Sequence, residues 1–282
     1  MKSHYSIIYS LLLVVVYGCG TEAFGLDIDY EKNLSAVNEN LARKGKYPII
    51  AHRGAWSETG HPQNSLAALK EALSLDIFGS ECDIWKTSDN VFVICHDQTY
   101  HGKDITKCTY AELAQYPLSN GERIPTLDDF LTALEASTTQ TKLVIELKSN
   151  AQPMEVFEAV NKRGLLHKVV FITYSYKKCQ TFASMGCGGI AYYIGGSKTP
   201  EEIRYNGIGG IIYSEENIRK VPDWIERSSN VGVQLVLGSV NNPSIMNQYI
   251  DRGCLFSSNR PITLVKAIDK QVKVRKATKK RR

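Results

Sequence analysis

Residues 142–175, KLVIELKSNAQPMEVFEAVNKRGLLHKVVFITYS, contain the repeating unit from which the fold can be predicted. Two apolar runs, 142–148 and 168–175, flank a segment of helical periodicity at Met154–Arg163. Strands that are apolar on both faces and alternate with amphipathic helices are typical of a parallel sheet covered by helices. The stretch therefore predicts one β–α–β unit of such a sheet.

The same unit recurs along the rest of the chain. The other expected strands are YPIIAH (47–52), GSECDIW (79–85), GIAYYIG (189–195), GGIIYS (209–214), VGVQLVLGSV (231–240) and CLFSS (254–258). The other expected helices are Asn64–Leu75, one that ends before Thr138, Tyr176–Met185, Glu201–Tyr205, Asn217–Ser228, Pro243–Arg252 and Pro261–Val272. Eight such units predict an α/β fold, a closed (β/α)8 TIM-type barrel, with a doubly wound open sheet as the alternative.

The alternation is interrupted once, after the second strand. No long helical segment follows that strand until Thr126, which leaves an excursion of roughly forty residues. Long connections after barrel strands lie at the C-terminal face, where active sites are built. We therefore expect the excursion to border the active site.

Polar residues interrupt two of the apolar strands at alternate positions. Because successive strand residues point to opposite faces, Glu81 and Asp83 share one face, as do Glu146 and Lys148. Burying three carboxylates on one inner face is costly unless a cation lies among them. Oxygen ligands favour a hard divalent cation, Mg²⁺ or Ca²⁺. The alternative is a set of structural salt bridges with Arg53 and Lys148.

Two histidines and two basic residues accompany these acids. His52 ends the first strand and His96 ends the run VFVICH, positions that suit acid–base chemistry near neutral pH. Arg53 and Lys148 supply positive charge for an anionic substrate, and several converging cations favour a phosphate over a carboxylate.

The ordered motifs HRG (52–54), ECD (81–83), HD (96–97) and ELK (146–148) resemble those of glycerophosphodiester phosphodiesterases. The resemblance covers residues 47–262, and its first hundred residues are the specific part. It implies a metal-dependent hydrolysis of glycerophosphodiesters to glycerol 3-phosphate and an alcohol. It also implies roles for seven residues: His52 and His96 as the acid–base pair, Glu81, Asp83 and Glu146 as metal ligands, and Arg53 and Lys148 as phosphate-binding residues.

The sequence departs from the family's pattern at three places. Gln63-Asn64-Ser65 stands where the family commonly has Glu-Asn-Thr, so Asn64 is kept as a candidate to orient His52 or the metal ligands. Gly238-Ser239-Val240-Asn241 replaces Trp-Thr-Val-Asn, which removes an apolar wall and makes Gly238 and Asn241 candidate pocket or supporting residues. Ser258-Asn259 stands where Thr-Asp is frequent. These changes bear on the preferred alcohol, and they leave open a lysophospholipase D-like activity on a lipid substrate. A non-catalytic lipoprotein that binds phosphodiesters or glycans is the remaining alternative.

The N-terminus has the pattern of an export signal. Lys2 and His4 precede an apolar run, 7–16, that is too short to span a bilayer. The run leads into VYGCG, which resembles the lipobox of bacterial lipoproteins and would make Cys19 the acylated N-terminus. We therefore expect a signal peptide (1–18), a lipid-anchored tether with a first helix (19–46), the barrel (47–272) and a basic tail (273–282). The protein would then be lipid-anchored in the periplasm or at the cell surface.

The net charge of +5 comes from that tail. The last ten residues carry seven Lys or Arg and no acid, which leaves 27 basic against 29 acidic residues in the remainder. A nearly neutral body with a short cationic tail, of a kind that is usually disordered, gives no case for nucleic-acid binding. The expected partners are a small phosphodiester substrate and the membrane. The six cysteines after Cys19 show no zinc spacing, and we interpret them as small buried apolar residues.

Overall fold

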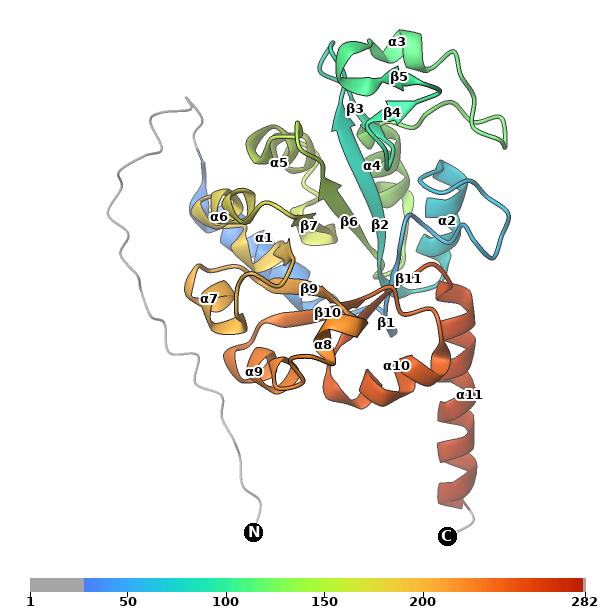
Figure 1. Ribbon diagram of the computed structural model, residues 1–282, viewed down its shortest axis with the longest axis vertical. Helices are drawn as coiled ribbons and strands as arrows, with labels where there is room; N and C mark the ends of the chain where they lie inside the picture. Colours follow the sequence, from blue (N-terminus) through green and yellow to red (C-terminus); the bar gives the residue numbers. More distant parts are fainter. Residues whose placement is uncertain (1–27, 281–282) are drawn as a thin grey trace.

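The structure is a computed structural model that describes residues 28–280. Eight parallel strands form a closed barrel, because the first pairs with both the second and the last (Figure 1). This confirms the predicted (β/α)8 fold and excludes the open sheet. The barrel strands are β1 (Tyr47–Ala51), β2 (Ile77–Lys86), β6 (Lys142–Leu147), β7 (Val169–Thr173), β8 (Ala191–Ile194), β9 (Gly210–Ser214), β10 (Gln234–Gly238) and β11 (Leu255–Ser258).

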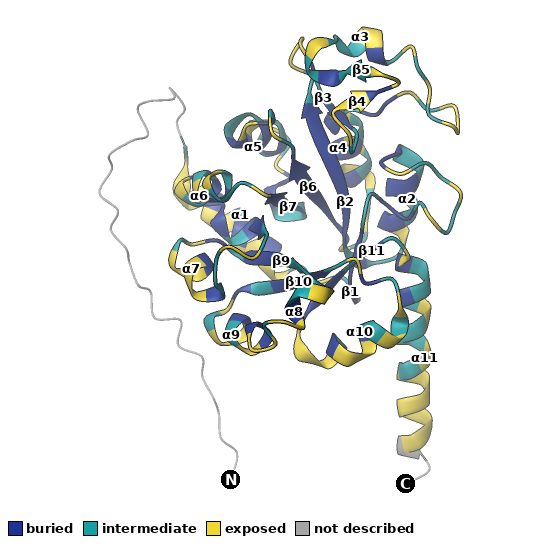
Figure 2. Ribbon diagram, viewed as in Figure 1, coloured by how far each residue is buried: buried dark blue, intermediate teal, exposed yellow. Residues whose placement is uncertain are grey.

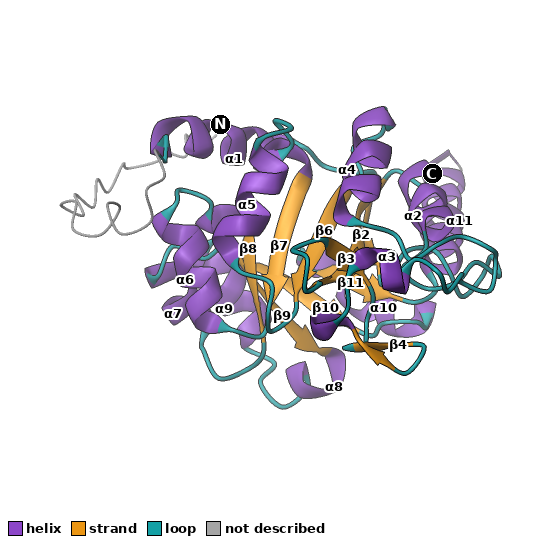
Figure 3. Cartoon of the chain, turned by 90° about the horizontal axis from the view of Figure 1, so that it is seen from above, coloured by secondary structure: helices purple, strands orange, loops and turns teal. Residues whose placement is uncertain are grey.

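Helices surround the strands, as the view from above shows (Figure 3). Most of them begin at a capping side chain; Ser65, for example, accepts a hydrogen bond from the Ala68 backbone N–H at 3.0 Å. The helices after the barrel strands are α2 (Leu66–Ser74), α4 (Leu127–Ala136), α5 (Pro153–Asn161), α6 (Tyr176–Ser184), α7 (Pro200–Tyr205), α8 (Glu215–Ile218), α9 (Trp224–Val231), α10 (Pro243–Tyr249) and α11 (Pro261–Lys280).

The side chains of the strands form two apolar layers, one inside the barrel and one between the barrel and the helices. Inside the barrel, one cluster gathers Ile50, Val144, Val170, Ile172, Tyr192, Val236 and Leu255. The other side chains of the same strands, such as Cys82 and Ile145, pack outward against the helices and are fully buried. The dark, buried strands of Figure 2 reflect this double burial, which explains why the strand sequences are apolar at nearly every position.

Two helices differ from the sequence-based expectation. The single helix expected at Asn217–Ser228 is two helices, α8 and α9, because Pro222 lies between them and disfavours helical geometry at Val221. The last helix continues beyond Val272 to Lys280, so most of the predicted basic tail is helical rather than irregular. Figure 1 shows α11 projecting past the other elements.

The excursion after β2 folds back on that strand and has an apolar core of its own. It contains β3 (Phe92–Ile94), which is antiparallel to β2, then β4 (Thr99–Tyr100), β5 (Lys103–Asp104) and α3 (Tyr110–Leu113). Six side chains form its core: Trp85, Val93, Tyr100, Ile105, Leu113 and Ile124. The Glu122 carboxylate accepts the backbone N–H groups of Leu66 and Ala67 at 2.8 and 3.1 Å, which ties the excursion to the start of α2.

A helix before the barrel, α1 (Tyr30–Ala42), packs against the segments that precede β7 and β8. Two buried asparagines hold it there: Asn33 donates to the Met185 carbonyl at 2.9 Å, and Asn40 donates to those of Leu166 and Val169 at 2.9 and 2.6 Å. The predicted signal peptide and Cys19 lie outside the described residues. Within residues 28–280, no helix is long and apolar enough to cross a membrane. The six described cysteines are free thiols, four of them buried.

Candidate active site

Three carboxylates meet inside the C-terminal end of the barrel. Asp83 and Glu146 are direct partners in the register of β2 and β6, and Glu81 lies one pleat below Asp83. One oxygen from each of the three lies within 4.8 Å of the others, and all three residues are buried. The structure thus places the predicted ligand set together, while Cys82 points into the opposite, outer core as the strand alternation predicted.

Lys148 lies between two of these acids. Its Nζ is 2.7 Å from Asp83 Oδ1 and 2.6 Å from Glu146 Oε1. Although burial favours the neutral amine, the charges of Asp83 and Glu146 outweigh it and raise the Lys148 pKa. Burial and the charge of Asp83 raise the pKa of Glu146 in turn. Lys148 therefore neutralises part of the cluster and supports the salt-bridge alternative for Asp83 and Glu146.

Glu81 is not neutralised in this way. Its Oε2 accepts the Arg53 backbone N–H at 2.8 Å, but Oε1 is buried without a hydrogen-bond partner in the described part of the chain. Burial, with the charges of Asp83 and Glu146, raises the Glu81 pKa well above its usual range. A divalent cation would satisfy that oxygen and offset the repulsion, and an all-oxygen set suits a hard ion. The three carboxylates therefore fit a metal better than salt bridges alone.

The Arg53 side chain reaches the cluster from the loop after β1. Its Nε is 3.6 Å from Asp83 Oδ2, and its Nη1 donates to Gln63 Oε1 at 2.8 Å. Gln63, which departs from the family's pattern, thus still orients the guanidinium. The backbone of Arg53 is left-handed, with φ of 60°, a conformation that costs a non-glycine residue roughly 1–2 kcal/mol. Such strain is typical of functional sites and here lets the Arg53 N–H face Glu81.

Asn64 supports a proposed ligand rather than His52. Its Nδ2 donates to Asp83 Oδ2 at 2.8 Å, and its Oδ1 accepts the Asp83 backbone N–H at 3.4 Å. Asn64 also has φ of 60° and is buried. Of the two roles predicted for it, the structure supports the second, because Asn64 contacts Asp83, one of the proposed metal ligands.

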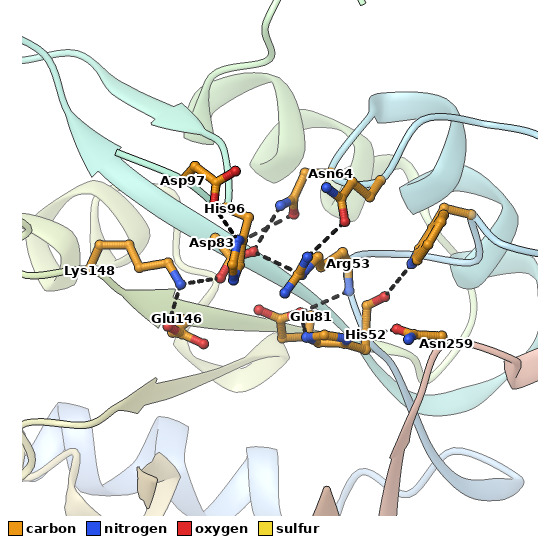
Figure 4. Close-up of polar contacts among 12 residues, drawn as sticks. His52, Arg53, Asn64, Glu81, Asp83, His96, Asp97, Glu146, Lys148 and Asn259 are labelled. Carbon is orange, nitrogen blue, oxygen red and sulfur yellow. Dashed lines mark hydrogen bonds and ion pairs between the residues drawn. The ribbon is translucent and has the colours of Figure 1, made fainter. Parts of the chain in front are cut away.

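His52 faces Glu81 from the end of β1. Its Nε2 is 4.0 Å from Glu81 Oε2, and its Nδ1 is 2.7 Å from Asn259 Oδ1, an acceptor that places the proton on Nδ1 (Figure 4). Burial lowers the His52 pKa, an effect that the Asn259 hydrogen bond partly opposes. Neutral His52 therefore presents an unprotonated Nε2 to the centre of the site.

Asn241 acts through Asn259. Its Oδ1 accepts the Asn259 backbone N–H at 2.8 Å and the Ser258 hydroxyl at 3.0 Å. Asn241 thus fixes the loop that holds His52 and is a positioning residue. Gly238, at the end of β10, is half-buried and has room for a side chain, because a Cβ there would meet its nearest atoms at 3.8 Å.

His96 comes from the excursion, two residues after the end of β3, and its side chain is drawn with the carboxylate cluster in Figure 4. Its Nδ1 lies 2.7 Å from Asp97 Oδ1, and its side chain is 38% exposed against 31% for His52. Both histidines are therefore accessible to a substrate, and each is held at Nδ1 by an oxygen acceptor. All seven core residues predicted from the sequence meet at this end of the barrel.

Sequence reasoning missed the contact between Asn259 and His52 and two residues at the rim. Trp56 donates its indole N–H to the His52 carbonyl at 3.1 Å. Tyr174 follows β7 and is 69% exposed, while burial of part of its ring and the charge of Glu146 raise its pKa. A polar or aromatic residue directly after a barrel strand is the signal that could have found Asn259 and Tyr174.

The fold and the site together define a (β/α)8 barrel that carries a carboxylate cluster and a cationic clamp at its C-terminal end. A family model described as the glycerophosphoryl diester phosphodiesterase family matches residues 52–188. A glycerophosphodiester phosphodiesterase structure from Parabacteroides distasonis is 30% identical with a TM-score of 0.74, and the match covers 81% of this chain and 99% of that one. The chain belongs to the glycerophosphodiester phosphodiesterase family.

Curated relatives match over shorter stretches. A probable glycerophosphodiester phosphodiesterase of Mycobacterium tuberculosis is 34% identical over 104 residues, which are 35% of this chain and 39% of the relative. A putative one of Bacillus subtilis is 33% identical over 127 residues, 40% of this chain and 50% of the relative. The chain thus spans at most half the length of these relatives. An Oleispira antarctica phosphodiesterase, solved with sn-glycerol-3-phosphate, shares the fold at 22% identity and a TM-score of 0.66, over 78% of this chain and 96% of that one.

Proposed function

We propose that the protein hydrolyses glycerophosphodiesters to glycerol 3-phosphate and an alcohol. The observation that carries the proposal is the buried, unpaired Oε1 of Glu81 within a cluster that Lys148 only partly neutralises. Membership of the family supports the same reaction. Salt bridges alone would leave that oxygen without a partner, whereas a metal and an anionic substrate would use both the acids and the cations.

Glu81, Asp83 and Glu146 would hold the metal, which we infer to be Mg²⁺ or Ca²⁺. When bound, such an ion supplies Lewis-acid polarisation of a phosphoryl oxygen. Arg53 and Lys148 would bind the remaining phosphate oxygens. Gln63 orients the Arg53 guanidinium, and the carboxylates of Asp83 and Glu146 orient the Lys148 ammonium group. The cations would thereby stabilise the negative charge that grows on the phosphoryl group.

The two histidines would divide the proton transfers. The unprotonated Nε2 of His52 would accept the proton of the attacking oxygen as that oxygen bonds to phosphorus. The bond from phosphorus to the leaving oxygen breaks, and His96, protonated, would give its proton to the departing alkoxide. The attacking oxygen is either water or the neighbouring glycerol hydroxyl, which would pass through a cyclic phosphate. Rapid-quench analysis of a single turnover distinguishes the two, because only attack by the hydroxyl forms a cyclic glycerophosphate before glycerol 3-phosphate appears.

A lipid substrate is the second candidate, because a specific observation favours it. Gly238 leaves room at the end of β10 where the family often has Trp, so this side of the candidate active site can accept a larger alcohol or acyl group. Turnover of a lysophospholipid at a rate above that of glycerophosphocholine would establish this alternative.

One assay tests the reaction and the metal together. Turnover of glycerophosphocholine should disappear in EDTA and return when Mg²⁺ or Ca²⁺ is added in excess. Full turnover in chelator would contradict the proposal. A metal-dependent turnover confined to other phosphodiesters would keep the mechanism and change the substrate.

We further infer that the protein is exported and lipid-anchored through Cys19. The support is the short apolar run followed by Val16-Tyr17-Gly18-Cys19. Mass spectrometry of the mature protein should find an acylated Cys19 as its first residue. The finding of the mature protein in soluble form, or of a mature chain that begins at another residue, would contradict this.

A further inference from the structure

The opposite, N-terminal end of the barrel has a pocket of about 580 Å³. Residues of β1, β2, β6, β8, β10 and β11 line it, together with the end of α1, part of α9 and Gly209 just before β9. Lys142 and Glu146 share the inner face of β6, four residues apart, so the pocket and the carboxylate cluster are separated by about 13 Å along the strand. The interior cluster that includes Val144 and Val236 lies between the two levels. The pocket is therefore separate from the candidate active site.

The lining of this pocket is cationic and contains no carboxylate. Five of its residues carry positive charge, and none is Asp or Glu: Arg43, Lys44, Lys46, Lys142 and Arg252. Two of the five have acids nearby outside the pocket, since Arg43 is 3.7 Å from Glu39 and Lys46 is 3.4 Å from Asp269. The other three, Lys44, Lys142 and Arg252, have no ion pair in the part of the chain that the structure describes, so the pocket keeps a net positive charge.

Lys142 is the most unusual of the five, because its residue is only 2% exposed. Its Nζ lies 4.6 Å from the centre of the Phe78 ring, and across residues 28–280 it has no hydrogen-bond acceptor or acid in contact. Burial and the charges of Arg43 and Lys44 lower its pKa to about 8. An ammonium group in such surroundings gains from an anion placed beside it.

Two other residues of the lining, Arg43 and Ser228, each carry a buried donor atom in the pocket wall that is left unsatisfied within residues 28–280. Arg43 Nε and Ser228 Oγ have no hydrogen-bond partner in the part of the chain that the structure describes. Together with Lys142, they come from three separate elements, the end of α1, α9 and β6. Lys142 Nζ can therefore contact a ligand in the pocket directly, and a rotation of the Arg43 or Ser228 side chain would bring a second donor to it, which favours a ligand with several acceptor oxygens.

We propose that this pocket is a second anion site that binds a phosphate group. A phosphate offers several acceptor oxygens and up to two negative charges, which matches the donors and the cations of the lining. The pocket also has apolar walls from Leu41, Phe78, Tyr192, Ile225 and Leu235, so the phosphate is either free or attached to an apolar group. The site does not depend on the proposed hydrolysis.

Calorimetric titration of the full chain with inorganic phosphate tests the site. Because the active site is expected to bind phosphate through Lys148, the titration is made in a Lys148→Met background, where phosphate should still bind at one site. Adding Lys142→Met should weaken that binding at least tenfold, and adding Ser228→Ala should weaken it several-fold. Adding Lys70→Met, at an exposed position on α2, should leave the phosphate affinity unchanged.

The same titration with dihexanoyl phosphatidic acid distinguishes the two possible sources of the phosphate group. Tighter binding than that of inorganic phosphate indicates a lipid headgroup, and equal binding indicates a free phosphate.

Two results would overturn the proposal. One is the loss of all phosphate binding in the Lys148→Met protein, and the other is equal binding with and without Lys142→Met. Ser228→Ala removes one oxygen only, so it remains informative where Lys142→Met alters the fold. Turnover of glycerophosphocholine by the Lys142→Met single variant should match that of the unmodified protein. Failure of this site is thereby distinguished from failure of the proposed reaction.

Discussion

The two ends of the barrel use the same strand for opposite purposes. At its C-terminal end β6 carries Glu146, in contact with Lys148 and close to two further carboxylates. At its N-terminal end it carries Lys142, with positive neighbours and no acid. The first end mixes both signs of charge at hydrogen-bond distance, whereas the second concentrates one sign. Mixed charges orient a reacting group, whereas a single sign attracts an oppositely charged ligand.

The largest effect is expected from the carboxylate end. Asp83→Ala removes the acid that contacts Lys148, Arg53 and Asn64 at once, and should lower metal affinity and reduce turnover by a factor on the order of 10³. Metal titration and initial rates measure the two losses. Cys82→Ser is the matched control, because its side chain faces the outer core and should cost stability but not turnover. Normal turnover by Asp83→Ala would remove the metal from the mechanism.

His96→Ala should separate proton transfer from metal binding. His96 lies on the excursion and is held by Asp97, outside the three carboxylates. Turnover should fall by roughly 10²–10⁴, the usual contribution of a positioned acid or base. Metal affinity, measured by titration, should remain within about twofold. An equal loss in both would show that His96 is a ligand rather than an acid.

Asn259→Asp should change the pH dependence more than the maximal rate. A carboxylate in place of the amide stabilises the protonated imidazole and raises the His52 pKa, which burial otherwise lowers. His52 as a base is active when unprotonated, so the acidic limb of the pH–rate profile should move to higher pH. A profile recorded from pH 5 to 9 shows the direction. An unchanged acidic limb would show that His52 is not the base.

At the cationic end, Lys142→Met should stabilise the protein without an effect on turnover. Lys142 has a pKa of about 8 in the fold, against 10.5 for an ordinary lysine, so its charge costs on the order of 3 kcal/mol below pH 8. Urea denaturation in phosphate-free buffer at pH 7 should give a free energy of unfolding higher by ~1–3 kcal/mol. The gain should shrink as the pH rises from 8 to 10.5, because the folded protein then releases this proton. A loss of stability at pH 7 would show that Lys142 has a favourable partner.

Truncation after Val272 should have the smallest effect. From Val272 onward, α11 is exposed as far as Thr278, and the contact made there, Arg275 with Asp251 at 3.0 Å, is a surface ion pair worth at most about 1 kcal/mol (Figure 2). Turnover of a small soluble diester and the melting temperature should be nearly unchanged. A large loss of turnover would show that this end of α11 influences the active site.

Strand alternation was sufficient to predict the carboxylate end. The faces of Glu81, Asp83, Glu146 and Lys148 follow from the two-residue period, and the apolar sequence around them marks the strands. The same period places Lys142 with Glu146, but the sequence does not show that a cavity opens there, because the lining comes from six different strands. The contact of His52 with Asn259 joins residues 207 apart, which no local pattern reveals. Pro222 was a local signal for the break between α8 and α9. The length of α11 had no such signal, because its run of charged residues is equally typical of a disordered tail.

The position of α1 bears on which end of the barrel would face away from an N-terminal anchor. The helix contacts the segments before β7 and β8, and its last turn leads into the pocket at the N-terminal end. The first turn of α1 packs on the segment before β8, so an anchor that preceded this turn would hold the molecule by the end opposite His52 and Glu146. A protein held in this way would present its carboxylate end outward, so that diffusing substrates reach it without passing the surface of attachment. The asparagines that dock α1, Asn33 and Asn40, would then determine the orientation of the whole molecule although they touch neither site.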